Sequence, residues 1–314
     1  MENIIKRRPY REMCDFCDVY NFMLKRFALD CANGCYPPFF EYALATPWSD
    51  KSQNHRFAIW EDQDGMAAFC WYESGLGEAF FNVADSHSFL IPEMVDHAER
   101  RLRDSQGKLR LKVFERQEKV LAEALRRGYR VVDREEQAIL DFSTARLNDS
   151  LPEGYAFEIA SQCDVEQLVD MTWRGFDNSG APYGGVEREY HTYAAPHATP
   201  ELGVIVKTQA GEYVCYAGMW WVPEIKLAYL EPLCTVPEHR GKGLARAALT
   251  EMYRKMAKLG ATHMTGGAIQ FYYEIGYQPG YAVLHLEKER ANRPVFCLPS
   301  KHRSIHGDNF LNMV

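Results

Sequence analysis

The sequence predicts an α+β protein with two tandem domains that repeat one design. Its 314 residues exceed the usual size of a single domain. Strand-like segments flank a glycine turn twice, at Gly65 and at Gly211, which lie 146 residues apart. A helix-like segment ends in a Gly-Tyr pair twice, at Gly128 and at Gly276, 148 residues apart. The two nearly equal offsets indicate a duplicated unit.

Each copy has the predicted order strand, helix, antiparallel hairpin, helix, strand, helix, strand. We expect the first copy to occupy residues 1–147 and the second residues 148–289, followed by a C-terminal tail at 290–314. A polar segment at 145–153, just before Gly154, breaks the periodic patterns and marks the linker.

The segment VPEHRGKGLA at 236–245 leads directly into a helical pattern. Apolar residues recur at helical spacing from Leu244 to Leu259, and Gly260 stands where the helix should stop. A helix that begins after a glycine-rich turn presents unpaired N–H groups and the positive end of its dipole. Such a junction binds phosphate.

Two glycines and two cations at this junction strengthen the phosphate-site prediction. Gly241 and Gly243 allow a tight turn in which N–H groups converge, and Arg240 and Lys242 add positive charge. The P-loop pattern is excluded because no Ser or Thr follows Lys242. The dinucleotide fingerprint is excluded because Arg246 stands where its third glycine belongs.

The spacing R-x-x-G-x-A at 240–245 resembles the acetyl-CoA loop of the GNAT superfamily, the general N-acetyltransferases. About 30 residues later, AIQFYYEIGY at 268–277 resembles the A-x-x-F-Y-x-x-x-G-F/Y helix of the same superfamily. The resemblance covers about residues 153 to 288. It implies two tandem GNAT-like domains, each a mixed, mostly antiparallel sheet flanked by helices, with acetyl-CoA as co-substrate.

The resemblance also implies which residues bind the cofactor. The strand before the loop splays from its neighbour in this superfamily, and its backbone pairs with the pantetheine arm. Pro232 fits such an interrupted strand because it lacks an N–H donor, although an ordinary edge strand is the alternative. The implied cofactor residues are Leu233, Thr235, Arg240, Gly241, Lys242, Gly243, Leu244 and Ala245.

By its place in the same motif, Tyr272 is the candidate general acid for the departing thiolate. Tyr273 is the second choice because it points about 100° away on the helix. The alternative is that Tyr272 packs in the core or only touches the cofactor sulfur.

Glu231 is the candidate base, since strict alternation along the strand would place its side chain on the same face as Leu233. A salt bridge or a rim charge explains Glu231 equally well. Asp177 and His263 are further candidates, and an amine that arrives deprotonated needs no base.

The superfamily usually binds its acceptor in the segment that corresponds to 173–190. Aromatic and acidic side chains there suit a cationic amine, although they are common in any partly buried loop. The predicted acceptor residues are Trp173, Phe176, Asp177 and Tyr183.

The first copy lacks both signatures of the second. FLIPEMVDHAERRLRD replaces the R-x-x-G-x-A segment, and Glu123-Ala124 occupies the position of Tyr272. We expect a degenerate GNAT-like domain without cofactor, which supports the active half or walls its acceptor cleft. The second copy departs from the family pattern at Thr265-Gly266-Gly267, where many members carry an Asn and a longer loop that makes one cofactor contact.

Composition argues against several classes of function. The formal charge of −7 argues against a nucleic-acid partner and is compatible with a cationic amine. No apolar run approaches the roughly 20 residues of a membrane helix, and the N-terminus has no apolar signal region. We therefore expect a cytoplasmic protein, monomer or homodimer, without a membrane partner.

Nine cysteines raise the question of a metal. The spacing of Cys14, Cys17, Cys31 and Cys35 loosely resembles a zinc site. However, Cys14 and Cys17 fall in a helical apolar pattern, where a cysteine is usually a small core residue. We expect no metal.

The predicted function is an acetyl-CoA-dependent N-acetyltransferase that transfers an acetyl group to a primary amine of a small molecule or peptide by direct attack. A non-catalytic acyl-CoA-binding or regulatory protein is the main alternative. A structural protein with a zinc-stapled first domain is the third. The acceptor and the acyl chain length cannot be predicted from the sequence.

Overall fold

The computed structural model describes residues 4–182 and 184–288, so the predicted tail at 290–314 lies outside the described residues. Within these described residues, twelve strands form one continuous sheet in the order β1-β2-β3-β4-β5-β12-β6-β11-β10-β9-β8-β7. The strands are β1 (Lys6–Pro9), β2 (Ala58–Asp62), β3 (Gly65–Trp71), β4 (Glu78–Val83), β5 (Arg110–Phe114), β6 (Tyr129–Asp141), β7 (Tyr155–Ile159), β8 (Val204–Thr208), β9 (Tyr213–Val222), β10 (Leu227–Thr235), β11 (His263–Gly267) and β12 (Gln278–Lys288).

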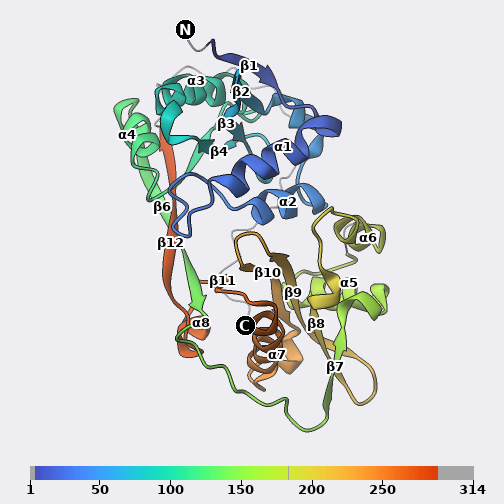
Figure 1. Ribbon diagram of the computed structural model, residues 1–314. Helices are drawn as coiled ribbons and strands as arrows, with labels where there is room; N and C mark the ends of the chain where they lie inside the picture. The colour runs from blue at the N-terminus through green and yellow to red at the C-terminus, as the bar shows by residue number, and fades with distance from the viewer. Residues whose placement is uncertain (1–3, 183, 289–314) are drawn as a thin grey trace.

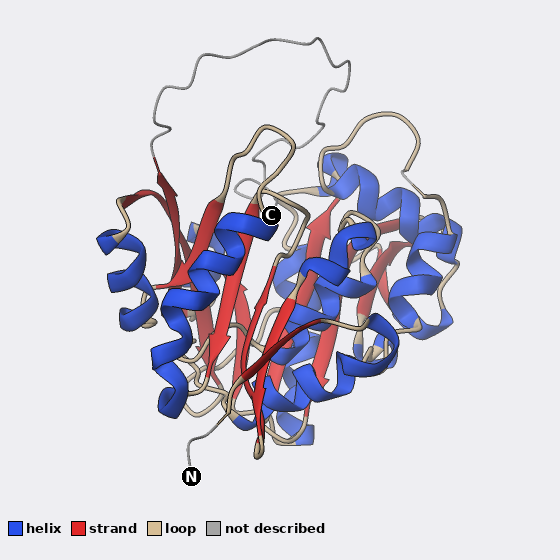
Figure 2. Cartoon of the chain, turned by 90° about the horizontal axis from the view of Figure 1, so that it is seen from above, coloured by secondary structure: helices blue, strands red, loops and turns tan. Residues whose placement is uncertain are grey.

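Helices cover both faces of this sheet (Figure 2). The α-helices are α1 (Glu12–Lys25), α2 (Pro37–Ala45), α3 (Ile91–Arg101), α4 (Glu118–Arg126), α5 (Val165–Gly175), α6 (Glu187–Tyr193), α7 (Leu244–Leu259) and α8 (Gln270–Glu274). The run from β1 to β6 and the run from β7 to β12 contain strands and α-helices in the same order. This repeat confirms the α+β class. The predicted element order was incomplete, because each half has a second helix before its hairpin and a third antiparallel strand after it.

The two halves exchange their last strands. Residues 283–286 of β12, from the second half, pair antiparallel with β5 of the first. Residues 137–141 of β6, from the first half, pair antiparallel with β11 of the second. β6 and β12 also pair with each other, and in Figure 1 they run side by side from one half to the other. Neither sheet is therefore complete without a strand from the other half, while the boundary at 147/148 stays a prediction.

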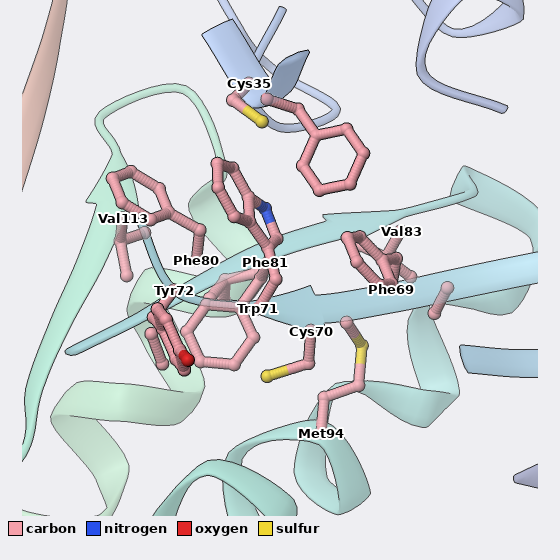
Figure 3. Packing of buried hydrophobic residues seen from close by; sticks show 14 of the residues in the cluster. Cys35, Phe69, Cys70, Trp71, Tyr72, Phe80, Phe81, Val83, Met94 and Val113 are labelled. Atoms are coloured by element: carbon pink, nitrogen blue, oxygen red, sulfur yellow. The ribbon is translucent and has the colours of Figure 1, made fainter. Parts of the chain in front are cut away.

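Each half has its own hydrophobic core, and the exchanged strands contribute to both. In the first half, side chains of β3 alternate, so that Trp71 points toward Cys35 and Cys70 toward Met94 of α3 (Figure 3). Leu286 of β12 is fully buried in this core. In the second half, the core includes Ala138 and Leu140 of β6.

The segment around α6 docks onto the first half. His197 donates its backbone N–H to Oε1 of Glu41 at 2.7 Å, and its ring stacks on Tyr20 with the ring centroids 4.1 Å apart. His191 Nδ1 lies 3.0 Å from the carbonyl oxygen of Ala45, the last residue of α2. The halves thus meet both through the sheet and through helices.

The prediction that Cys14 and Cys17 are core residues is wrong, because both are exposed. The buried face of α1 is formed by Val19, Phe22 and Met23, which lie on the other side of the helix. Among residues 4–182 and 184–288, no three His, Cys, Asp or Glu gather in a way that could hold a metal ion. No helix in the same ranges has both the length and the apolar character that crossing a bilayer requires.

Candidate active site

β10 and β11 are paired at one end and separate toward the other. They pair in parallel only at Leu227 and Ala228. Just beyond these two pairs, the backbone N–H of Leu230 donates to the side-chain Oγ1 of Thr265 at 2.8 Å. Beyond that point β10 continues to Thr235 along β9 alone. A gap between two parallel strands therefore opens beside residues 231–235.

A β-bulge lies where this gap begins. The register between β9 and β10 shifts between Leu230 and Leu233. Pro232 cannot donate to the ladder. Opposite it, Gly218 of β9 has no side chain to collide with the Glu231 carbonyl, which would lie 2.3 Å from a Cβ at that position.

The bulge overturns one expectation. An extra residue reverses the alternation of a strand, so Glu231 and Leu233 do not share a face as strict alternation predicted. Leu233 packs in the core of the second half, whereas Glu231 faces Tyr42 of α2 in the first half.

The bulge also determines in which direction the backbone N–H and C=O groups of β10 point after Pro232. The N–H of Val236 donates to the carbonyl of Val214 on the β9 side, at 3.0 Å. By alternation, the backbone groups of Leu233 and Thr235 face away from β9, toward the gap.

Unpaired N–H groups gather at the start of α7. Gly241 and Gly243 adopt φ of 72° and 81°, a conformation that favours glycine. Gly243 caps the helix without a side-chain hydrogen bond, and Gly260 ends it in the left-handed conformation. Among the described residues, no acceptor receives a hydrogen bond from the N–H groups of 241–246. These donors are available to a ligand.

The two cations predicted beside this turn have different surroundings. Arg240 donates to the carbonyl oxygens of Thr235 (3.0 Å) and Gly175 (2.9 Å) and pairs with Asp177 (3.0 Å). Its guanidinium thus braces the end of α5 against β10. Lys242 is exposed on the turn.

Tyr272 of α8 lies against two glycines of β11. A Cβ on Gly266 would lie 2.8 Å from the Tyr272 ring and 2.6 Å from the Tyr277 ring. The Gly266–Gly267 pair that departs from the family pattern thus makes room for these rings. Burial and the charge of Glu231 raise the pKa of Tyr272 far above its usual range, and the Gly267 backbone N–H opposes this in part. The phenol is therefore protonated at neutral pH.

The Glu231 side chain is largely surrounded by protein but remains partly exposed to solvent. Loss of hydration raises its pKa to about 7. A hydrogen bond with Tyr42 opposes this shift and the charge of Glu135 adds to it. A carboxylate with such a pKa is half ionised near neutral pH and can accept a proton from a bound ammonium.

Three of the four predicted acceptor residues already contact other parts of the protein. Trp173 Nε1 donates to the carbonyls of Ser179 (3.3 Å) and Gly180 (3.1 Å), within its own loop. Phe176 packs on the core of the second half, and Asp177 is occupied by Arg240. Tyr183 lies outside the described residues. A role for these residues in binding the acceptor stays a prediction.

The corresponding gap in the first half is filled. β4 and β5 pair in parallel only at Glu78 and Ala79 and then separate, as β10 and β11 do. Gln117 spans this gap: its Nε2 donates to the carbonyl of Phe81 at 2.8 Å, and its Oε1 accepts from the N–H of Phe114 at 3.2 Å. Gln117 is buried. A side chain thus bridges the separated backbones of β4 and β5.

Residues 165–277 match the model of the Acetyltransferase (GNAT) family. No functionally curated protein matches the sequence. A tandem GNAT protein from the clavulanic acid biosynthesis pathway is similar in structure, with 12% identity and a TM-score of 0.62 over 92% of this chain and 100% of that one.

Two bacterial structures give comparable similarities. A GCN5-related N-acetyltransferase from Sphaerobacter thermophilus is 14% identical, with a TM-score of 0.57 over 90% of this chain and 95% of that one. A GNAT-family acetyltransferase from Colwellia psychrerythraea is 11% identical, with a TM-score of 0.58 over 90% and 100%. The chain therefore has the tandem GNAT fold, and residues 165–277 match the GNAT acetyltransferase family.

Proposed function

We propose that this protein is an acetyl-CoA-dependent N-acetyltransferase that acetylates a primary amine of a small molecule or peptide by direct attack. The observation that carries this proposal is the set of unpaired N–H groups at 241–246, next to the gap between β10 and β11. The GNAT match supports an acyl-CoA as donor. In the reaction the amine loses a proton, a C–N bond replaces the C–S bond, and CoA leaves as its thiolate.

The N–H groups of 241–246 would hold the diphosphate, with the positive helix end and Lys242 beside it. The backbone groups of Leu233 and Thr235 would pair with the pantetheine arm. The Thr235 carbonyl already accepts from Arg240, so its N–H is the group left for the ligand. Arg240 then acts by positioning β10, in place of a direct phosphate contact.

Glu231 is the proposed base. Its pKa of about 7 lets the carboxylate take the proton of an incoming ammonium without holding it so tightly that release to water is slow. The bulge matters here because it turns Glu231 toward the first half, away from the buried side chain of Leu233.

Tyr272 is proposed to serve the departing thiolate. A thiol has a pKa of about 8.5, so complete proton transfer from a phenol with a strongly raised pKa is uphill. Tyr272 therefore acts mainly as a hydrogen-bond donor to the sulfur, which stabilises negative charge as it develops.

Thermal unfolding with and without acetyl-CoA tests the donor site. Ligand at 100 times its Kd adds about 2.7 kcal/mol to the free energy of unfolding, and the absence of any shift at millimolar acetyl-CoA would refute the proposal. Release of CoA thiol with an amine panel then separates an enzyme from an acyl-CoA-binding regulator, which would show the shift alone. Tyr272→Phe should lower kcat about 10-fold to 100-fold at unchanged acetyl-CoA affinity.

A further inference from the structure

Tyr42 of α2 reaches from the first half to the proposed base. Its side chain is a hydrogen-bond partner of Glu231. Its ring meets the ring of Trp220 on β9 edge-on, with the centroids 6.1 Å apart. Trp220 is paired across the ladder with Tyr229 of β10, two residues before Glu231. The position of α2 therefore decides whether the Tyr42 hydroxyl reaches the Glu231 carboxylate.

A carboxylate one residue earlier on α2 holds this helix to the second half. Glu41 is 1% exposed. Its Oε1 accepts the backbone N–H of His197 at 2.7 Å, and its Oε2 lies 2.6 Å from Nδ1 of the His197 ring. Burial raises the pKa of the Glu41 carboxyl, and these contacts with His197 oppose the rise. Both oxygens of a buried carboxylate are thus paired with one residue of the other half.

Two residues after His197, the chain is anchored on β9. Thr199 Oγ1 donates to the carbonyl of Met219 at 2.6 Å and accepts the backbone N–H of Trp221 at 3.2 Å. Met219 and Trp221 flank the tryptophan that meets the Tyr42 ring. α2, this short segment and β9 therefore form a closed chain of contacts, in which the carboxylate–imidazole pair is the link to the first half.

We propose that Glu41 and His197 are positioning residues for the proposed base. Their pair fixes α2, and α2 places the Tyr42 hydroxyl at the Glu231 carboxylate. This inference rests on the proposed function, in which Glu231 accepts the proton of the amine. Glu41 and His197 act on the reaction through Tyr42, whose hydroxyl stabilises the ionised carboxylate.

The consequence is a pH dependence with a definite sign. Burial raises the pKa of Glu231 to about 7, and the Tyr42 hydrogen bond holds it from rising further. Loss of that bond should move the midpoint of kcat/KM against pH upward by about one pH unit. At pH 7 this lowers the ionised fraction, and hence kcat/KM, about 5-fold, whereas at pH 9 it changes little. The other titratable groups that interact electrostatically with Glu231 are the same in every variant below, namely Glu73, Glu135, Tyr229, Cys234, Tyr272 and Tyr281.

His197→Ala tests the inference, because the His197 side chain is 43% exposed and its loss leaves the hydrophobic cores intact. CoA release with the best amine of a panel should show the raised midpoint, at an unchanged KM for acetyl-CoA. His197→Asn keeps an N–H donor near the Nδ1 position and should restore most of the wild-type profile. Tyr42→Phe removes the hydroxyl itself and should raise the midpoint at least as far. Adding His197→Ala to Tyr42→Phe should then move it no further.

His87→Ala is the matched control. His87 Nε2 lies 3.0 Å from Oδ2 of Asp62, so this variant also removes the imidazole of a histidine–carboxylate pair, but one that joins two segments within the first half. Its midpoint should stay near 7. An unchanged midpoint in His197→Ala or in Tyr42→Phe, or an equal rise in His87→Ala, would overturn the inference.

Carbon-13 NMR of the glutamate carboxyl groups separates this inference from the proposed function. The Glu231 signal is assigned by its absence in Glu231→Gln, and its titration midpoint is measured without turnover. A midpoint that rises in His197→Ala and Tyr42→Phe but not in His87→Ala would support the positioning role even if no amine releases CoA. In that case only the catalytic proposal fails. Amine-dependent CoA release with a midpoint that none of these variants moves would show the reverse.

Discussion

Gly266 is the position where a single methyl group should affect both stability and turnover. In Gly266→Ala the new Cβ would lie 2.6 Å from Cε1 of Tyr277 and 2.8 Å from Cδ1 and Cε1 of Tyr272. Carbon atoms pack at about 3.5–4.0 Å, so both rings must retreat by about 1 Å. Both rings are buried, and Tyr272 also meets Tyr277 edge-on, with their centroids 5.0 Å apart. The strain therefore cannot be relieved by movement into solvent.

Two magnitudes follow from this displacement. Overpacking of a core costs about 1–3 kcal/mol, which should appear as a lower free energy of unfolding in urea. A displacement of about 1 Å at a reacting group can cost roughly 100-fold in rate, so kcat for CoA release should fall by about that factor. Gly267→Ala is the graded comparison, because its Cβ would lie 3.2 Å from Cε2 of Tyr272 and needs only a small adjustment.

The double variant Gly266→Ala/Tyr272→Phe shows whether the kinetic effect passes through Tyr272. If it does, the double variant should be no slower than Gly266→Ala alone, because the hydroxyl has already lost its position. Wild-type stability and kcat in Gly266→Ala would refute the packing argument. Fully additive losses in the double variant would show that the methyl group acts elsewhere.

Two further predictions concern Glu231 and β12. Because the pKa of Glu231 is raised to about 7, kcat/KM for an amine should rise with pH through about 7 in wild type, and this step should vanish in Glu231→Gln. The same shift means that ionisation of Glu231 opposes folding, so its contribution to the free energy of unfolding should decline between pH 4.5 and about 7. Leu286→Ala should lower the free energy of unfolding by about 2–5 kcal/mol and destabilise residues 58–114 in hydrogen exchange, since Leu286 is fully buried in the core of the first half. Protection of that segment equal to wild type would contradict the shared core.

Local sequence patterns were sufficient to predict those elements whose interacting residues are near one another in the sequence. The two glycine hairpins are β2–β3 and β8–β9, and the helix predicted from Leu244 to Leu259 has those bounds, with Gly260 as its cap. In these cases the turn and the apolar spacing specify the structure without help from distant residues.

Pairing between distant strands was not predictable in the same way. β6 and β12 carry patterns that suit either half, and nothing local specifies which sheet receives them. The exchange follows from which neighbours are free once both halves are assembled. The bulge at Glu231 was missed for a related reason: alternation was assumed to continue through Pro232, and the partner that permits the bulge, Gly218, lies on another strand.

The surroundings of the candidate base had no sequence signal. Glu231 is a hydrogen-bond partner of Tyr42, which lies on α2 in the first half, and no local pattern links two residues so far apart in the sequence.

The strand exchange gives the first half, which we predict to lack a donor site, a structural connection to the second. The first half bridges the gap between β4 and β5 with the side chain of Gln117. Its sheet nevertheless extends through β12 and β6 directly to β11, where Gly266 receives the ring of Tyr272. Substitutions in the first-half core should therefore alter kcat/KM for the acceptor while leaving the N–H groups at 241–246, and with them acetyl-CoA affinity, unchanged.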